Sequence, residues 1–197
     1  MITLDSRTGS AELMPYFPTQ TTRLGHLEFG DANFLGKGPM GQPFSVGIER
    51  KTIRDLINSI QSGRFTGHQL PGMITSYNIN YLILEGVFRV FPDQIEVFEQ
   101  GKWVQINFGG KHLDPLLNTL EVVTGVVVRQ TSNQRQTAEL IYHLYKWWQK
   151  GWEKHRGHLG FNVEPRTAAF LSKPSLVRTV AKDLPGIGWE KSKAVED

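Results

Sequence analysis

Apolar and polar positions alternate along several segments of the first fifty residues, as they do in β-strands. The pattern predicts strands over residues 1–4 and 24–29, a hairpin over residues 33–44 and a returning strand over residues 44–51. The hairpin loop is rich in glycine but lacks the spacing of a phosphate-binding P-loop, which argues against nucleotide hydrolysis.

From residue 53 onward the spacing of apolar residues becomes that of an amphipathic helix, which Gly63 can end. Strands and helices continue to alternate beyond it. In chain order we expect a buried strand over 81–84, an antiparallel hairpin over 86–107 around Gln100-Gly101, a helix over 113–124, a buried strand over 125–129 and a helix over 132–150. This alternation predicts an α/β domain with a mixed sheet flanked by helices.

The last fifty residues differ in character from the rest. Residues 151–165 are rich in Gly, His and charge, so they are interpreted as a linker after a domain over residues 1–150. Residues 166–197 are expected to form a small helical segment, with helices over 175–182 and 189–197 on either side of a Leu-Pro-Gly-Ile-Gly turn.

The composition is that of a globular protein. Of the 197 residues 39% are hydrophobic, and no window approaches the ~18 apolar residues that a membrane-spanning helix needs. The chain has no cysteine, which excludes disulfides, thiolate zinc sites, iron–sulfur clusters and a cysteine nucleophile. Because no secretory leader is recognisable either, we expect an intracellular protein that does not enter the membrane.

Charge is unevenly distributed between the two halves of the chain. Residues 1–100 carry a formal charge of −2, and residues 101–197 carry +5. A basic half suits a polyanion such as nucleic acid, and acidic residues in the other half suit a metal ion.

Three residues point most clearly to chemistry: Asp31, Glu49 and Lys51. Alternation along the strand places Glu49 and Lys51 on one side and Arg50 on the other, and antiparallel pairing with the preceding strand would bring Asp31 beside Glu49. Two carboxylates suit Mg²⁺, and a nearby lysine can orient a water or offset charge on a reacting phosphodiester. A Glu-x-Lys triplet alone also fits a solvated edge strand.

The residues around Glu49 and Lys51 form a longer motif that distinguishes between a metal site and a solvated edge strand. The stretch Gly47-Ile-Glu-Arg-Lys-Thr-Ile-Arg-Asp55 resembles the nuclease domain of the XPF-type structure-specific DNA endonucleases, which carry E-R-K-x-x-x-D before a helix, an S-I-x-x-G-R-like stretch and a Gln. Gly30-Asp31, the apolar run that ends at Glu85-Gly86, and the segment from Val126 to Ala138 match that family as well. The resemblance spans nearly the whole chain.

The resemblance implies a restriction-endonuclease-like fold and a metal-dependent active site. Asp31 and Glu49 would be the ligands of Mg²⁺, for which Mn²⁺ would substitute. Lys51 would orient water or stabilise charge. Arg50 matches a motif position that the family needs for activity.

Other motif positions have two interpretations each. Asp55 matches a catalytic position, but Thr52 and Asp55 also fit a helix capping box. Asp5 is either an auxiliary carboxylate of the site or a surface residue. Arg64 and Gln69 either contact DNA or stabilise a loop.

One departure from the family pattern is visible near the N-terminus. The family has a Glu after its D-x-R, whereas Asp5-Ser6-Arg7 is followed by Thr8. Glu12 or Glu85 could take the place of that Glu.

The C-terminal turn has the form of a helix-hairpin-helix, a DNA-binding motif. Gly186 and Gly188 let backbone N–H groups approach a phosphate, and Lys191 and Lys193 add electrostatic affinity. The alternative is a helical hairpin without a ligand. The resembling family ends in two such hairpins, and residues 166–197 match the first of them.

The helix over 132–150 carries an apolar stripe: Ala138, Ile141, Tyr145, Trp148 and, beyond it, Trp152. The stripe fits the core or a subunit interface, and the resemblance implies a homodimer. The six histidines show no spacing typical of a zinc site.

The function that the resemblance implies is a magnesium-dependent endonuclease that cuts branched DNA, such as a 3′ flap, fork or nicked junction. No helicase motif is present, so a helicase or processivity partner is expected to supply unwinding. The alternatives are a catalytically weak DNA-binding subunit that positions an active partner, and a general nuclease without selectivity for branches.

Overall fold

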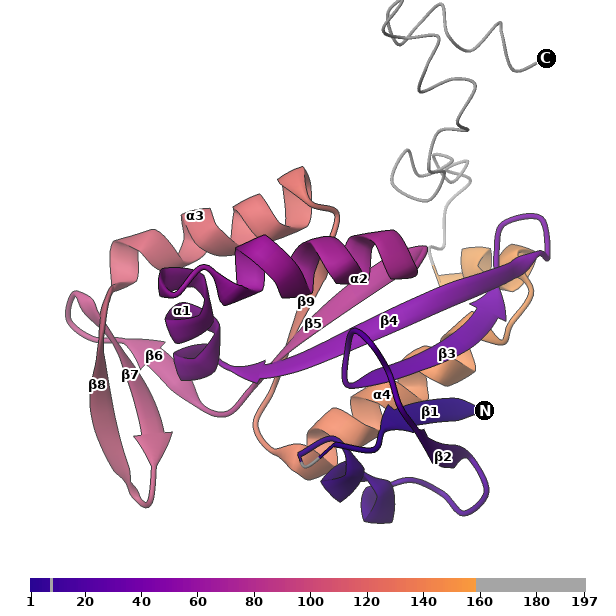
Figure 1. Ribbon diagram of the computed structural model, residues 1–197, viewed down its shortest axis with the longest axis horizontal. Helices are drawn as coiled ribbons and strands as arrows, with labels where there is room; N and C mark the ends of the chain where they lie inside the picture. The colour runs from indigo at the N-terminus through magenta and orange to yellow at the C-terminus, as the bar shows by residue number, and fades with distance from the viewer. Residues whose placement is uncertain (8, 159–197) are drawn as a thin grey trace, which may run out of the picture. The chain divides into compact units, whose positions relative to one another are not determined.

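A six-stranded mixed sheet forms the centre of the structure, a computed structural model that describes residues 1–7 and 9–158. Its strands lie in the order β2-β1-β3-β4-β5-β9, and neighbouring strands are both parallel and antiparallel (Figure 1). The strands are β1 (Ile2–Asp5), β2 (Thr22–Gly25), β3 (Ala32–Lys37), β4 (Pro43–Thr52), β5 (Ile79–Glu85) and β9 (Val127–Thr131). The predicted α/β fold with a mixed sheet is confirmed.

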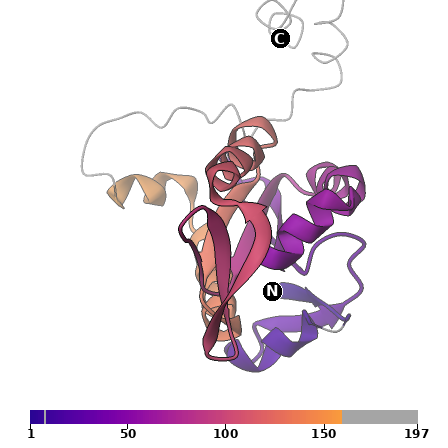
Figure 2. The ribbon, with the colours of Figure 1, turned by 90° about the vertical axis from the view of Figure 1, so that its left-hand side faces the viewer.

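A second sheet of three antiparallel strands lies between β5 and the next helix in the chain, and Figure 2 shows it nearest the viewer. It consists of β6 (Phe88–Val90), β7 (Gln94–Glu99) and β8 (Lys102–Gly109). The predicted turn at Gln100-Gly101 joins β7 to β8, and both residues have positive φ, as tight hairpins require. Strand β6 is an addition that the sequence did not predict.

Helices cover both faces of the central sheet (Figure 1). On one face α1 (Ile53–Gln61) packs with the second sheet around an apolar core. On the other face α4 (Gln134–Trp148) lies against β3, β5 and β9. The remaining helical elements are η1 (Ala11–Tyr16), η2 (Phe65–Gln69), α2 (Leu70–Ser76), η3 (Gly110–His112), α3 (Leu113–Asn118), η4 (Thr119–Val123) and η5 (Trp152–His158).

The apolar stripe of α4 packs against the sheet. Ala138, Ile141 and Trp148 are buried, and Trp148 stacks on Phe44 with ring centroids 5.2 Å apart. The indole N–H of Trp148 donates to the Tyr81 hydroxyl at 3.2 Å, which satisfies its one polar group. The interpretation of this stripe as core is therefore confirmed for these positions.

The predicted strand over 24–29 is wrong in its bounds, because the strand spans Thr22–Gly25. Beyond Gly25, side chains from β1 and from the loop after it form the hydrogen bonds to the backbone at Leu27. The Leu27 amide donates to Asp5 at 3.2 Å, and the Leu27 carbonyl accepts from Arg7 at 2.9 Å. These bonds replace strand pairing.

Two later elements also differ from the prediction. The helix over 113–124 is α-helical only to Asn118 and continues as the wider turn η4. The strand expected over 125–129 is β9, and it is only partly buried because it pairs with β5 alone at the edge of the sheet. Within the predicted linker, Trp152–His158 forms a short 3₁₀ helix.

In the described part of the chain, no helix combines the length and apolar character that crossing a bilayer demands.

Candidate active site

Antiparallel pairing of β3 with β4 brings the two predicted metal ligands together. Ala32 pairs with Ile48, and the Asp31 amide donates to the Ile48 carbonyl at 2.7 Å, so Asp31 lies directly beside Glu49. The sequence predicted that Asp31 would lie beside Glu49 if these two strands paired antiparallel, and they do. Alternation along β4 then places Glu49 and Lys51 on one face and Arg50 on the other, as predicted.

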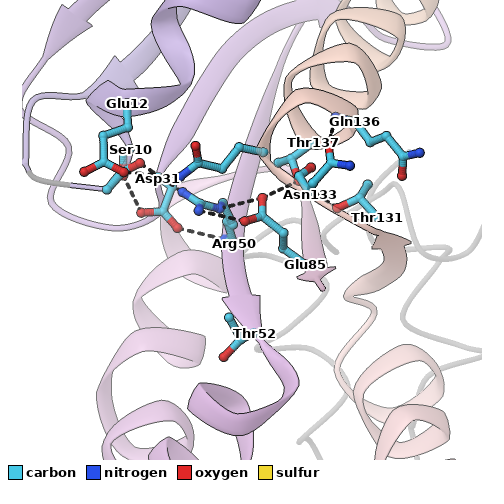
Figure 3. A network of polar contacts seen from close by, with 12 residues as sticks. Ser10, Glu12, Asp31, Arg50, Thr52, Glu85, Thr131, Asn133, Gln136 and Thr137 are labelled. Carbon is cyan, nitrogen blue, oxygen red and sulfur yellow. Dashed lines mark hydrogen bonds and ion pairs between the residues drawn. The ribbon is translucent and has the colours of Figure 1, made fainter. Parts of the chain in front are cut away.

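Hydrogen bonds orient the Asp31 carboxylate from both sides. Its Oδ1 accepts from the Ser10 hydroxyl at 2.6 Å, and its Oδ2 accepts from the backbone amide of Arg50 at 2.7 Å (Figure 3). Carboxylate oxygens have more than one lone pair each, so both remain able to accept a cation.

Glu49 is buried and lies between a cation and an anion. Its Oε1 is 2.9 Å from the Lys51 ammonium and accepts from the Gln69 amide at 3.3 Å. Burial raises the pKa of Glu49 above its ordinary value, and the charge of Asp31 raises it further, although Lys51 partly opposes both. The repulsion between Asp31 and Glu49 is what a bound cation would relieve.

A pocket of about 270 Å³ opens in front of these carboxylates. Four of its lining residues carry carboxylates. Three of them lie on or next to neighbouring strands: Asp5 on β1, Asp31 directly before β3 and Glu49 on β4. Its lining residues are Asp5, Arg7, Ser10, Glu28, Phe29, Gly30, Asp31, Glu49, His68 and Gln69.

The residues of the pocket fit Mg²⁺. This ion usually binds through one or two carboxylates and keeps several waters, which matches the Asp31–Glu49 pair. Among the described residues, no cluster of three or more His, Cys, Asp or Glu side chains could hold a metal ion. The pair is supplemented by the buried Oε1 of Gln69, which has no hydrogen-bond partner and can accept from water.

Asp5 also lines the pocket, and contacts with Arg7 and Leu27 hold its carboxylate in place. It forms an ion pair with Arg7 and accepts from the Leu27 amide. Burial tends to raise the pKa of Asp5, but the hydrogen bonds from Arg7 and Leu27 and the charge of Arg7 outweigh it, so the pKa lies below its ordinary value. Asp5 is therefore charged in the neutral range and part of the site's wall.

Arg50 lies on the opposite face of β4 and does not line the pocket. Its guanidinium makes two bonds to the Glu85 carboxylate, at 2.9 and 2.8 Å (Figure 3). It also donates to the Gly9 carbonyl at 2.9 Å. Gly9 directly precedes Ser10, which holds Asp31. Arg50 is thus placed to position Asp31 through this loop, in addition to the bond from its own amide.

The network continues from Glu85 into α4. Glu85 accepts from the Thr137 hydroxyl at 2.6 Å, and the Thr137 and Thr131 hydroxyls are 2.7 Å apart. A second link joins η1 to the same helix, where Gln134 donates to Glu12 at 3.2 Å. The orientation of Asp31 therefore depends on groups as distant in the chain as α4.

The remaining candidates from the sequence fall in different places. Asp55 is exposed at the start of α1, where the Thr52 hydroxyl accepts from its amide at 3.1 Å and donates to its carboxylate at 2.8 Å, so the capping geometry is present. Gln69 lies in the pocket, whereas Arg64 is exposed outside it. Glu12 and Glu85, named as possible substitutes for the family Glu, bond to groups outside the pocket and do not line it.

Some predicted residues lie outside the described part of the chain: Thr8, Gly186, Gly188, Lys191 and Lys193. Conversely, the pocket contains residues to which the sequence assigned no role: Arg7, Ser10, Glu28 and His68. Only Arg7 had a signal, since it belongs to the Asp5-x-Arg7 motif. Ser10 and Glu28 reach the site through the path of the loops, and His68 reaches it from the short helix η2.

Comparisons with known proteins agree with the fold. The model of the ERCC4 domain matches residues 18–144. The structure of XPF from Aeropyrum pernix is similar with a TM-score of 0.52 and 17% identity, covering 98% of this chain and 78% of that one. The structure of XPF from Aeropyrum pernix in complex with DNA covers the same shares at 17% identity, with a TM-score of 0.50. No curated protein sequence matches.

Proposed function

Because the chain belongs to the ERCC4 domain family, the XPF-type nuclease family that its sequence resembles, we propose that it is a magnesium-dependent, structure-specific DNA endonuclease. The substrates would be branched DNA, such as a 3′ flap, a fork or a nicked junction. The observation that carries the proposal is the pairing of the Asp31 and Glu49 carboxylates in one pocket, with Lys51 2.9 Å from Glu49.

In this proposal three residues of the pocket and the neighbouring Lys51 have distinct tasks. Asp31 and Glu49 hold Mg²⁺, which when bound supplies positive charge to a phosphodiester oxygen and to the attacking water. Lys51 stabilises charge that develops on the phosphate and favours the ionised form of Glu49. The free Oε1 of Gln69 accepts a hydrogen bond from water and helps to orient it.

The choice of branched substrates is proposed from the family. The C-terminal Leu184–Gly188 turn, with Lys191 and Lys193, would provide a second phosphate-binding surface, and dimerisation would place two such surfaces on one DNA. A helicase or processivity partner would supply unwinding.

The proposal is tested with end-labelled 3′-flap, fork and linear duplex DNA in Mg²⁺, Mn²⁺ or EDTA. We expect wild type to cut near the branch only with metal, and Asp31→Asn to lower the rate by at least about 100-fold because the metal loses a ligand. Asp93→Asn is the matched control, since Asp93 is exposed in the turn between β6 and β7.

Other outcomes favour the alternatives. Binding to the flap without any cleavage would indicate a DNA-binding subunit that positions another nuclease. Equal cutting of duplex and flap would indicate a general nuclease. The intact Asp31, Glu49 and Lys51 favour an active enzyme over the subunit.

A further inference from the structure

A second hollow, of about 430 Å³, lies on the same face of the central sheet as the active-site pocket. Residues two positions apart on a strand share a face and are about 6.6 Å apart. Three strands each contribute one residue to the pocket and another to the hollow. The pairs are Asp5 and Thr3 on β1, Asp31 and Asn33 at β3, and Glu49 and Ser45, with Gly47 between them, on β4.

Tyr77 forms the boundary between the pocket and the hollow. Its ring lies directly on Gly47, where a Cβ would come within 2.1 Å of a ring carbon. Its hydroxyl donates at 2.7 Å to the carbonyl of Phe29, a residue of the active-site pocket. Burial raises the pKa of Tyr77, a hydrogen bond with Asn33 lowers it, and the charges of Asp5 and Glu49 raise it further, so this hydroxyl lies within electrostatic reach of the catalytic carboxylates.

The hollow differs from the pocket in its charge. None of its eight lining residues is acidic, and they are Met1, Thr3, Arg23, Asn33, Phe34, Leu35, Ser45 and Tyr77. The guanidinium of Arg23 is exposed and donates through Nε to the Thr3 hydroxyl at 3.1 Å. In the described part of the chain Arg23 makes no ion pair, so its charge is available to an anion.

The surface around the hollow is open. Helix α4 covers the other face of β3, where Phe34 contacts Tyr145. On the face that bears the hollow, Leu35 is 64% exposed, and the polar residues Asn33 and Ser45 are only partly covered. The cationic Arg23 and the uncharged polar Asn33 and Ser45 therefore form an open surface that continues along the sheet from the carboxylates.

We propose that this hollow binds the backbone phosphate next to the one that is cut, so that a single nucleic-acid strand runs along β1, β3 and β4. Arg23 supplies the charge, and Asn33 and Ser45 supply uncharged polar groups. Tyr77 separates the phosphate in the hollow from the one at the carboxylates. The inference rests on the proposed nuclease function and adds to it the path of the strand.

The test uses the full chain with Asp31→Asn, which keeps DNA uncut, and measures binding of fluorescent single-stranded and 3′-flap DNA by anisotropy at several salt concentrations. Arg23→Gln is expected to weaken binding about tenfold and to reduce the slope of log affinity against log salt by about 0.7–0.9, the value for one phosphate contact.

A second variant adds an opposing charge without removing a contact. Leu35→Glu is expected to weaken binding to a similar extent through repulsion of the phosphate. Its matched control is Leu24→Glu on β2, because Leu24 is also exposed, at 47%, but lies on the opposite face of the sheet from Arg23.

The outcomes separate the two proposals. Loss of binding in Arg23→Gln and Leu35→Glu but not in Leu24→Glu supports the hollow, even if wild type cuts no DNA and the nuclease proposal fails. Binding of all three variants like the parent overturns the hollow, even if cleavage by wild type depends on Asp31. Failure of the parent itself to bind DNA overturns it as well.

Discussion

At the scale of single residues, Arg50 forms two separate sets of contacts, one through its backbone and one through its side chain. Its amide holds Asp31, and its guanidinium holds Glu85 and the Gly9 carbonyl. The residue is a positioning residue by this geometry, because its charged group does not reach the pocket where Glu49 lies. This geometry gives Arg50 a positioning role that needs no contact with substrate.

This arrangement makes a prediction for Arg50→Lys. An ammonium cannot keep the two-pronged contact with Glu85 and the bond to Gly9 together, so we expect a loss of about 2 kcal/mol in the free energy of unfolding. Urea denaturation measures it.

The matched control is Arg54→Lys, because Arg54 makes the same kind of pair with Glu99 on the exposed surface. Exposed pairs contribute little, so this change should cost less than about 0.5 kcal/mol. Equal losses in the two variants would contradict the role assigned to Arg50.

Asp5 gives a prediction for pH. Because its pKa is lowered in the folded protein, its charge stabilises the fold above the ordinary pKa of 3.8, and this contribution is lost as pH falls through the folded value. Asp5→Asn should therefore lower the free energy of unfolding by about 1 kcal/mol at pH 7, since Arg7 is half-exposed and solvent screens the pair.

The measurement compares urea denaturation of wild type and Asp5→Asn at pH 7 and at pH 3. The difference between the two proteins should shrink at the lower pH. A difference that stays constant would show that the charge of Asp5 is not its source.

At the scale of elements, the start of α1 follows directly from the sequence. Thr52 caps the helix and Asp55 lies in its first turn, as the spacing predicts. Alternation in β4 likewise predicted the faces of Glu49 and Lys51. The partners of Arg50 could not be predicted, because Glu85 and Gly9 lie 35 and 41 residues away and only the sheet order brings them close.

The capping arrangement separates a structural from a catalytic Asp55. Thr52→Ala should cost about 1 kcal/mol of stability, and Asp55→Asn about 0.5 kcal/mol through loss of charge at the helix N-terminus. If Asp55 only stabilises the helix, Asp55→Asn cleaves flap DNA at nearly the wild-type rate when fully folded. A loss of cleavage as large as that of Asp31→Asn, without loss of stability, would assign it a direct role.

At the scale of the whole molecule, the sequence predicted the fold class and the hairpin of β7 and β8, but not the third strand of the second sheet, β6. The segment over 86–107 shows one clear turn signal, at Gln100-Gly101, and β6 has only three residues, too few for a pattern. Ser10, Glu28 and His68 were missed for a related reason. Ser10 and Glu28 come to the pocket from loops, and His68 comes from the five-residue helix η2, and neither kind of segment has an apolar periodicity that predicts the pocket.

The pairing of β5 with β9 has a consequence for the order of folding. Strands β3 and β4 are neighbours in the chain and form a local hairpin. Tyr81 and Val127 also pair, but the whole second sheet and α3 lie between them in the sequence. Contacts between distant segments tend to form late, because closing the long loop costs entropy before any contact repays it. The bond from Thr137 to Glu85 depends on this late step.

Stopped-flow kinetics can therefore reveal when the Asp31 support is completed. Thr137→Val should speed unfolding and leave the folding rate nearly unchanged, because its contacts are absent from the transition state. Val46→Ala, in the local hairpin, should slow folding instead. Slower folding in Thr137→Val would place α4 in the early structure. On the expected result, the carboxylates meet early in folding, and the network that orients them is the last part of the site to form.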